Sequence, residues 1–172
     1  MRDQAAVTGG MEVLWAPWRM EYVGEATAGG GCVFCEKPQA GDDRKAFILH
    51  RGLHCFVIMN IFPYSTGHVM IAPFRHLDRL ERLATDEMAE VAHLAQRTTA
   101  ILGEVIGAEG FNLGMNLGRV AGAGVAGHLH LHVVPRWAGD TNFMPVIGGV
   151  KVMPEALEAT YEKLVSRYRA KD

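Results

Sequence analysis

The sequence predicts an α+β fold in which an antiparallel sheet carries two main helices. The chain has 172 residues, of which 49% are hydrophobic, so we expect one domain with a buried core. Strand-like runs follow one another as neighbours and do not alternate with helices, which favours an antiparallel sheet over a doubly wound parallel one. We expect residues 1–10 to form a loose tail and residues 11–172 to form the single domain, which ends in a C-terminal helix.

The predicted strands are short runs of β-branched, aromatic and aliphatic residues bounded by turn residues. They cover residues 47–49, 55–59, 68–72, 111–117 and 129–135. A turn cluster at residues 63–67 precedes the third strand, and Pro73 ends it. A glycine-rich loop, residues 118–127, separates the last two strands.

Two segments have the apolar spacing of helices. The first is predicted to begin at Thr85 as N-cap, with Asp86 and Glu87 in its first turn, and to run to about Ile106, where Gly107 ends it. The second is predicted from Pro154, in its first turn, to about Ala170. Its apolar stripe consists of Leu157, Tyr161, Leu164 and Tyr168.

Charge and composition limit the classes of partner. The net charge of −2 provides no basic excess for binding a nucleic-acid duplex, although a small anion needs only a local pocket. No apolar run is long enough to span a membrane, and the N-terminus lacks the apolar region of a secretory signal. We therefore expect a cytoplasmic protein with no nucleic-acid or membrane partner.

The three cysteines cannot all form disulfides with one another. Cys32 and Cys35 lie between two glycine-containing loop segments, so we expect them on a turn, where such a pair fits a metal site, a redox pair or neither. A redox role is disfavoured because no thioredoxin-like β-α-β pattern surrounds the pair. Cys55 lies in an apolar run and is expected to be a small buried hydrophobic residue.

Three histidines, His128, His130 and His132, alternate with apolar residues. Because alternate residues of a strand point to one side, the imidazoles share a face while Leu129, Leu131 and Val133 point into the core. A solvated face or a metal site would also use histidines, but alternate side chains start about 6.6 Å apart, so one ion would not easily reach all three. Imidazole near pH 7 is neutral, nucleophilic and able to form a labile bond to phosphorus, so the triplet predicts phosphate chemistry on a nucleotide.

The glycine-rich loop directly precedes these histidines. Its glycines, at positions 118, 122, 124 and 127, would allow backbone amides to approach an anion closely. Alone, such a loop is an ordinary flexible turn, but its position before three aligned histidines predicts a phosphate cradle. The sequence contains no Walker-type phosphate loop and no dinucleotide-binding glycine fingerprint.

With these features the sequence resembles the histidine triad (HIT) superfamily of nucleotide hydrolases and transferases. Residues 128–134 match its H-x-H-x-H-x-x motif with apolar x, and residues 60–63 with Gly67 and His68 resemble its ribose-binding strand and turn. The resemblance covers about residues 14–149. It implies a compact α+β unit that forms a homodimer through its sheet and attacks the α-phosphorus of a nucleotide.

The resemblance also implies roles for individual residues. His130 would be the nucleophile that forms a covalent nucleotidyl intermediate, and His128 and His132 would orient it and bind phosphate or the leaving group. Asn60 would hold the ribose, and His68 would line the site. The remaining implied nucleotide-binding residues are Asn116, Gly122, Gly124, Val125 and Trp137. Many members carry Gln-Thr or Ser-Thr just before the first histidine; this loop lacks those side chains, so backbone amides are expected to replace them.

Within that family the sequence is similar to the diadenosine tetraphosphate phosphorylases. The similarity lies in residues 14–19, 134–137, 139–143 and 148–152. In that branch inorganic phosphate, and not water, resolves the intermediate, and a loop of small residues would leave room for that second phosphate. Arg136 and Trp137 would lie near the distal part of the substrate, with packing at a strand end as the alternative for Trp137.

The resemblance also bears on the cysteine pair. Tetrahedral zinc would need two ligands besides Cys32 and Cys35. Some family members use two cysteines and two histidines, which implies His76 and His128 as the other two, and His76 is expected to end the strand that begins at His68. A closed site of four protein ligands is structural, not catalytic. A surface position is the alternative for His76.

Three other functions remain open from the sequence. A nucleoside phosphoramidase or adenylate-conjugate hydrolase would use the same histidines on a different leaving group. A nucleotide-binding sensor would bind without turnover. A zinc-stapled interaction module would have no affinity for nucleotides.

Overall fold

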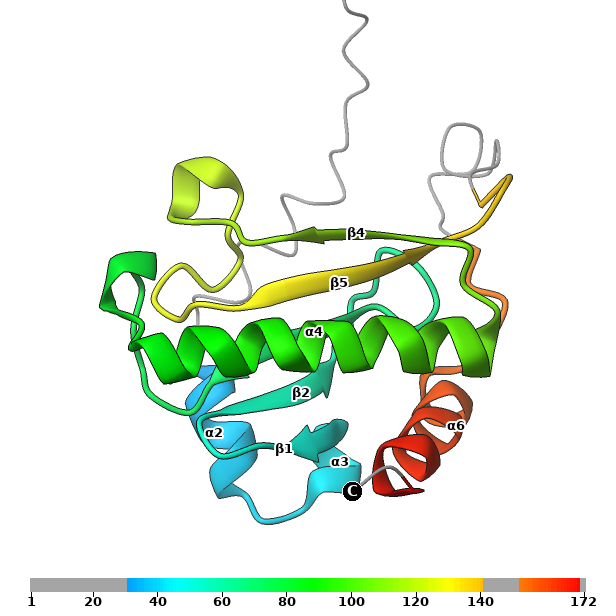
Figure 1. Cartoon of the computed structure of the whole chain (residues 1–172), viewed down its shortest axis with the longest axis horizontal. Coiled ribbons are helices and arrows are strands. Elements are labelled where there is room, and N and C mark those ends of the chain that lie inside the picture. Colours follow the sequence, from blue (N-terminus) through cyan, green and yellow to red (C-terminus); the bar gives the residue numbers. More distant parts are fainter. Residues whose placement is uncertain (1–30, 141–151, 171–172) are drawn as a thin grey trace, which may run out of the picture.

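The computed structural model describes residues 31–140 and 152–170, and it confirms the α+β fold (Figure 1). Within these residues, one antiparallel sheet has the strand order β1-β2-β3-β5-β4. The strands are β1 (Ile48–Arg51), β2 (Cys55–Met59), β3 (Val69–Pro73), β4 (Gly110–Gly114) and β5 (Leu131–Arg136). The helices are α2 (Val33–Gln39), α3 (Asp43–Ala46), α4 (Thr85–Ile106) and α6 (Leu157–Ala170), with 3₁₀ turns η1 (Leu80–Arg82) and η2 (Arg119–Ala121).

Some predicted features lie outside the described residues. They include the tail at residues 1–10, the tryptophan segment at residues 14–19 and the glycines at positions 148 and 149. No helix in the described part of the chain is both long and apolar enough to cross a bilayer.

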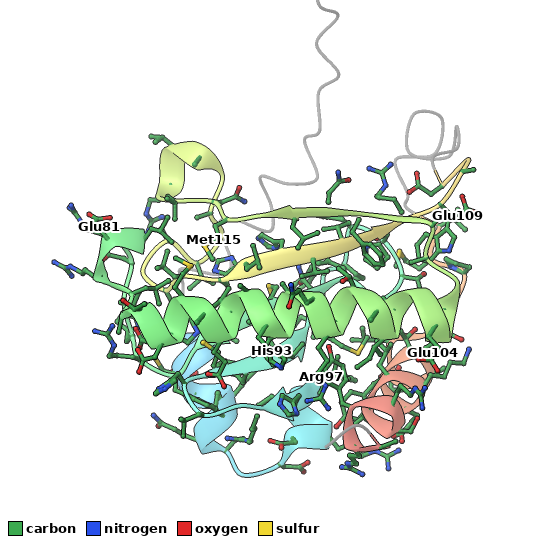
Figure 2. All side chains as sticks on the ribbon, in the orientation of Figure 1. Glu81, His93, Arg97, Glu104, Glu109 and Met115 are labelled. Atoms are coloured by element: carbon green, nitrogen blue, oxygen red, sulfur yellow. The ribbon has the colours of Figure 1, made fainter. Side chains whose placement is uncertain are left out.

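Helices α4 and α6 cover one face of the sheet and form the large core. Alternate strand residues such as Val57 and Val133 pack there against Leu94 of α4 and Leu164 of α6. Burying one such side chain contributes about 1.5–3 kcal/mol, so this face supplies most of the hydrophobic stabilisation. Polar contacts join the two helices as well: Arg97 and Glu104 extend from α4 toward α6 (Figure 2).

A smaller core lies on the opposite face of the sheet. Phe34 of α2 and Ala46 of α3 pack there against Phe56 and Ile58 of β2. This core contains residues of β1, β2 and β3 but none of β4 or β5. Helix α2 therefore covers the half of this face that β1, β2 and β3 form. Its Phe34 side lies next to the start of β5.

Helix α4 ends where the sequence predicted, at Gly107, whose φ of 63° is in the left-handed region that glycine tolerates. Its predicted start is wrong by one residue, because Ala84 occupies the N-cap position and Thr85 is already helical. Alanine has no side-chain acceptor, so Glu87 supplies the polar contact: its carboxylate accepts the Ala84 N–H at 2.8 Å.

Helix α6 carries the predicted stripe, with Tyr161, Leu164 and Tyr168 buried in the large core. Its predicted start at Pro154 is wrong, because the helix begins at Leu157. A proline is allowed in a first turn but does not require one. The Thr160 N–H bonds to the Ala156 carbonyl, so helical hydrogen bonding begins at Ala156 and not at Pro154.

The ends of β4 and β5 also differ from prediction. Strand β5 begins at Leu131 and not at Leu129, because its pairing with β3 ends at Ile71 and Leu131, and the Leu129 N–H instead bonds to the Leu77 carbonyl at 2.7 Å. Strand β4 ends at Gly114 and not at Leu117, because Gly114 is its last residue paired with β5. The glycine loop therefore begins close to the histidines.

Candidate active site and metal centre

The triad lies at the start of β5, on the sheet face that α2 partly covers. His128 and His130 precede the strand and are buried, and His132 is its second residue. The rings of His130 and His132 meet edge to face with centroids 4.8 Å apart. Val133 is fully buried in the core of the other face, as the predicted alternation requires.

The main chain holds His130 in one tautomer. Its Nδ1 lies 2.8 Å from the carbonyl oxygen of His128. A carbonyl only accepts, so Nδ1 carries the proton and donates, which leaves the lone pair on Nε2. Burial lowers the pKa of His130, so the ring is neutral at pH 7. Together these effects give a nucleophilic Nε2.

A second chain of hydrogen bonds fixes His132. The Tyr64 N–H donates to Nδ1 of His68 at 3.0 Å, so the proton of His68 is on Nε2. That Nε2 lies 2.9 Å from Nδ1 of His132 and donates to it. Nδ1 of His132 thus acts as the acceptor, and the His132 proton is on Nε2. Its neighbours therefore make His132 a hydrogen-bond donor through Nε2.

Asn60 lies beside this chain, directly after β2. It is buried, its Oδ1 accepts the Phe62 N–H at 3.0 Å, and its Nδ2 lies 3.4 Å from Nδ1 of His68. The structure therefore brings Asn60 and His68 together, as the sequence predicted. The role of Asn60 in holding a ribose stays a prediction.

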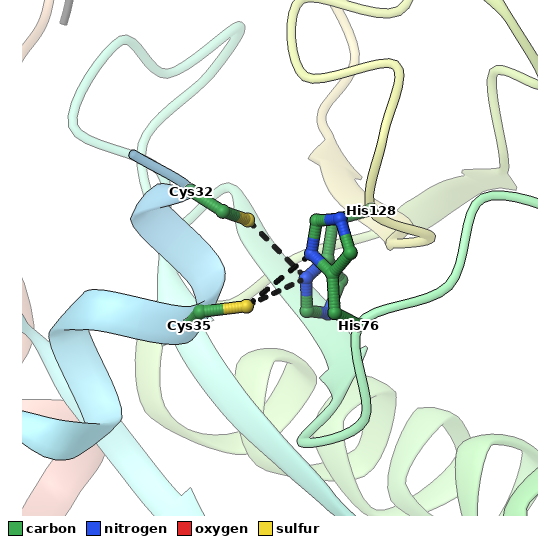
Figure 3. Close-up of side chains that lie close together, drawn as sticks. All are labelled: Cys32, Cys35, His76 and His128. Carbon is green, nitrogen blue, oxygen red and sulfur yellow. Dashed lines mark hydrogen bonds between the residues drawn. The ribbon is translucent and has the colours of Figure 1, made fainter. Parts of the chain in front are cut away.

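Cys32, Cys35, His76 and His128 form a second cluster, shown in Figure 3. Nδ1 of His128 lies 3.3 Å from Sγ of Cys32 and 3.6 Å from Sγ of Cys35, and Nδ1 of His76 lies 3.3 Å from Sγ of Cys35. Nε2 of His128 donates to the Pro73 carbonyl at 2.8 Å, so its Nδ1 presents a lone pair to the sulfurs.

This geometry fits a metal ion. The four ligand atoms lie within 4.8 Å of one another. Tetrahedral zinc, with Zn–S about 2.3 Å and Zn–N about 2.0–2.1 Å, would separate a sulfur ligand from a nitrogen ligand by about 3.6 Å. Burial, together with the neighbouring Cys32, raises the pKa of Cys35, because two thiolates so close repel each other. A bound cation would remove that cost.

Two expectations about this cluster are wrong. The cysteines lie on a helix and not on a turn: Cys32 is the N-cap of α2 and Cys35 is in its first turn. The Cys35 and Glu36 N–H groups both bond to the Cys32 carbonyl at 2.9 Å, which winds the segment into a helix. His76 does not end a strand but follows the end of β3 at Pro73.

The glycine loop contains the 3₁₀ turn η2. Gly118 and Gly122 flank it with φ of 83° and 85°, values that other residues rarely adopt. Asn116 donates from Nδ2 to the Gly122 carbonyl at 3.4 Å, and Val125 packs against the smaller core. Contacts between this loop, including Gly124, and phosphate stay a prediction.

Trp137 follows β5 at the end of the strand opposite to the triad. It lies five residues beyond His132, which is about 16 Å along an extended chain. Arg136 pairs with Asp140 and Asn112. A contact of Trp137 with the distal part of a substrate stays a prediction.

Two aromatic residues at the site were not predicted. The Phe34 ring stacks on His130 with centroids 4.8 Å apart, and the Tyr64 ring lies 4.7 Å from the ring of His68. The position of Phe34 within the Cys-x-x-Cys segment places it near the metal ligands in sequence. Its contact with His130 depends on how α2 crosses the sheet, which no local pattern encodes.

This sheet, with its three alternating histidines entering β5, defines a histidine triad protein. A profile of the HIT domain matches residues 43–139. The chain is 39% identical over 166 residues to AP-4-A phosphorylase of Mycobacterium tuberculosis strain H37Rv, covering 92% of this chain and 85% of that protein. The chain therefore belongs to the HIT family of nucleotide hydrolases and transferases and is an enzyme of that family.

Further relatives agree with this assignment. An adenosine 5'-monophosphoramidase of Schizosaccharomyces pombe is 26% identical over 138 residues, which are 80% of this chain and 98% of that protein. A zinc-bound histidine triad family protein from Mycobacterium smegmatis superposes with a TM-score of 0.65 at 26% identity, covering 85% of this chain and 96% of that one. A hypothetical histidine triad nucleotide-binding protein from Sulfolobus tokodaii gives 0.63 at 27% identity, with coverages of 81% and 90%.

Proposed function

We propose that the protein transfers a nucleotidyl group from a dinucleoside polyphosphate, such as diadenosine tetraphosphate, to inorganic phosphate through His130. The proposal is supported by the identity of 39% to an AP-4-A phosphorylase. The structural observation that carries it is the bond from Nδ1–H of His130 to the His128 carbonyl, at 2.8 Å.

In the first step, Nε2 of His130 attacks the α-phosphorus and the bond from that phosphorus to the bridging oxygen breaks. The ring then bears a proton on Nδ1 and phosphorus on Nε2, so it is positively charged. The His128 carbonyl faces that Nδ1–H and stabilises the charge. The leaving group is ATP, and Nε2–H of His132, oriented through His68, donates to its terminal oxygen.

In the second step, an oxygen of inorganic phosphate attacks the same phosphorus and the P–N bond breaks. The products are ADP and the neutral imidazole of His130. Backbone amides at Gly122, Gly124 and Val125, with Asn116, are proposed to hold phosphates, and Asn60 to hold the ribose. Trp137 is proposed to contact the distal part of the substrate.

We further propose that Cys32, Cys35, His76 and His128 hold a structural zinc ion. Zinc with four protein ligands has no open position for substrate, so when bound it would supply a cross-link and no Lewis-acid chemistry. The cross-link joins α2, the segment after β3 and the segment before β5. The sulfur–nitrogen distances support this proposal.

The family resemblance and the exposed edge of the sheet support a proposal about the quaternary state. Strand β4 is at the edge of the sheet, and Leu113 on it is 48% exposed. An exposed edge strand favours pairing with another chain, so we propose a homodimer joined through the sheet. A cytoplasmic location stays a prediction.

One alternative has an observation in its favour. The relative in Schizosaccharomyces pombe, an adenosine 5'-monophosphoramidase, aligns with 80% of this chain. A phosphoramidase would use the same His130 but release an amine and pass the nucleotidyl group to water.

Product analysis tests the proposal. Purified protein is incubated with diadenosine tetraphosphate, with and without inorganic phosphate, and the nucleotides are separated. ADP plus ATP formed only with phosphate is the predicted result. AMP plus ATP formed without phosphate would make the protein a hydrolase, and turnover of only an adenosine phosphoramidate would favour the alternative.

Two variants complete the experiment. His130→Ala should retain nucleotide binding and lose turnover, whereas His93→Ala, on the exposed side of α4, should retain both. If wild-type protein binds nucleotides but turns over none of these substrates, the protein is a sensor and the proposal fails.

A further inference from the structure

We propose that Phe34 is a positioning residue. It holds the imidazole of His130 in one orientation when the Cys32–Cys35 segment at the start of α2 is ordered. A metal ion on the two thiols would then affect the nucleophile without touching the substrate. The proposal rests on the proposed role of His130 and extends it, because it makes activity depend on the metal centre.

The contact itself is between two buried rings. Phe34 is 2% exposed and His130 is 6% exposed. Their centroids are 4.8 Å apart with an angle of 28° between the planes, a stacked arrangement. Phe34 also contacts the ring of His128, at 5.3 Å and 47°. One aromatic side chain therefore packs on both the metal ligand and the nucleophile.

His130 needs this packing to keep one orientation. Among the described residues its ring makes a single hydrogen bond, from Nδ1 to the His128 carbonyl. One hydrogen bond at one ring atom fixes a distance but leaves the ring free to tilt about that atom. The edge contact with His132 limits one side, and Phe34 limits a face. Loss of Phe34 should let Nε2 move away from the line of attack.

Phe34 is in turn held by the segment that carries the thiols. It lies between Cys32 and Cys35, in the turn closed by the bonds from the Cys35 and Glu36 N–H groups to the Cys32 carbonyl. Helix α2 has only 7 residues, contains Pro38 and has no side-chain cap. So short a helix has little stability of its own and depends on tertiary contacts.

The metal cluster provides such contacts. Cys32 and Cys35 face Nδ1 of His128, and Cys35 also faces Nδ1 of His76. A metal ion bound there would hold the Cys32–Cys35 segment on both sides of Phe34. We therefore expect the metal-loaded protein to have an ordered His130 ring, and the metal-free protein to have a mobile one.

The test compares wild type, Phe34→Leu and Phe34→Tyr in the full chain, each after chelation and again after addition of Zn²⁺. Leucine keeps an apolar side chain but loses the ring face, and tyrosine restores it. Phe56→Leu is the matched control, because Phe56 is fully buried in the same small core but stacks on Phe74 and not on the triad. Bound zinc and thermal unfolding are measured for every sample.

The first readout is the NMR spectrum of the histidine rings, which needs no substrate. The His130 signal, assigned by its loss in His130→Ala, should be sharp in zinc-loaded wild type and Phe34→Tyr. It should be broad in metal-free wild type and in Phe34→Leu, even when Phe34→Leu has bound zinc. Phe56→Leu should behave as wild type. A sharp signal in Phe34→Leu would overturn the proposal.

The second readout is steady-state kinetics. Phe34→Leu should lower kcat roughly 10- to 100-fold with little change in KM, because misplacing a reacting group has costs of that order. Zinc should raise kcat of wild type but not of Phe34→Leu. A rise in KM alone would make Phe34 a substrate contact and contradict the proposal. If no substrate is turned over but the His130 signal responds as predicted, the proposed function fails and the positioning role stands.

Discussion

The carbonyl oxygen of His128 lies 2.8 Å from Nδ1 of His130, while Nδ1 of His128 itself lies 3.3 Å from Sγ of Cys32. One residue thus offers its main chain to the nucleophile and its side chain to the metal cluster. Its Nε2 bond to the Pro73 carbonyl fixes the ring for both tasks. The proposed metal centre and the proposed nucleophile are therefore adjacent parts of one segment, and disturbance of either should be detected at the other.

Thiol reactivity should report metal binding. In metal-free native protein, Cys32 and Cys35 should react with a thiol reagent, and added zinc should protect both. Cys55 should stay unreactive until unfolding, because it is fully buried and burial raises its pKa to about 12. His76→Ala should remove the protection by zinc while leaving the unreactivity of Cys55 unchanged. Rapid reaction of Cys55 in the native state would contradict the packing described here.

The hydrogen-bond chain through His68 predicts a defect that is larger in catalysis than in binding. His68→Ala should lower kcat by roughly 10- to 100-fold, because His132 loses the donor that fixes its tautomer. Nucleotide affinity, measured by calorimetry, should fall by a smaller factor than kcat, because Asn60 loses only its contact with His68. Tyr64→Ala is the control, since the main-chain N–H that bonds to His68 remains. Equal losses of kcat in the two variants would indicate that ring packing, and not the tautomer, is what matters.

Two glycines with similar backbone angles should respond differently to alanine. Gly67 and Gly107 have φ of 74° and 63°, so alanine is strained at either by about 1–2 kcal/mol. A Cβ on Gly67 would lie 2.6 Å from Cδ1 of Ile106, whereas nothing lies within 4 Å of one on Gly107. Overpacking adds about 1–3 kcal/mol. Denaturant unfolding should therefore show the larger loss for Gly67→Ala, and equal losses would contradict the close packing of that turn.

Glu87 predicts an acid-dependent loss of stability. The guanidinium of Arg75 bonds to this carboxylate and lowers its pKa from the usual 4.5 to about 2. Because the folded pKa is the lower one, the stabilisation is complete above about pH 5 and disappears as the pH falls from 4.5 toward 2. Glu87→Gln should cost about 1–2 kcal/mol at pH 7, less than the full shift implies, because Arg75 is 54% exposed and water screens the pair.

The measurement for Glu87→Gln is urea unfolding of metal-free protein at pH 7 and at pH 2.5, so that loss of metal in acid does not interfere. The difference from wild type should shrink at the lower pH. Glu81→Gln is the control, because Glu81 is 70% exposed and should have no effect at either pH. A difference that is the same at both pH values would show that the loss comes from packing and not from charge.

The sequence was most informative where structure depends on local pattern. The spacing of apolar residues and the glycine at 107 predicted the end of α4, and the alternation of His128, His130 and His132 predicted their common face. The sheet was predicted as antiparallel because its strands follow one another in the chain. The first two of these features depend on neighbours within a few residues, whereas the sheet also pairs β3 with β5, which is distant in the chain.

Features set by tertiary contacts were predicted less well. The start of β5 depends on where its pairing with β3 ends, at Ile71, and the start of α4 depends on Glu87 taking the place of a capping side chain. The helical setting of the cysteines and the stacking of Phe34 on His130 depend on how α2 lies on the sheet. Such relationships between distant segments are not encoded in residue spacing.

In the proposed mechanism, Nε2 of His130 carries the nucleotidyl group. The test is to mix wild-type protein with diadenosine tetraphosphate in the absence of inorganic phosphate, quench rapidly without acid, and locate the modified residue by peptide mass spectrometry. We expect one adenylyl group on His130, removed with formation of ADP when phosphate is added, and none in His130→Ala. An adenylyl group on another residue, or turnover by His130→Ala at the wild-type rate, would contradict it.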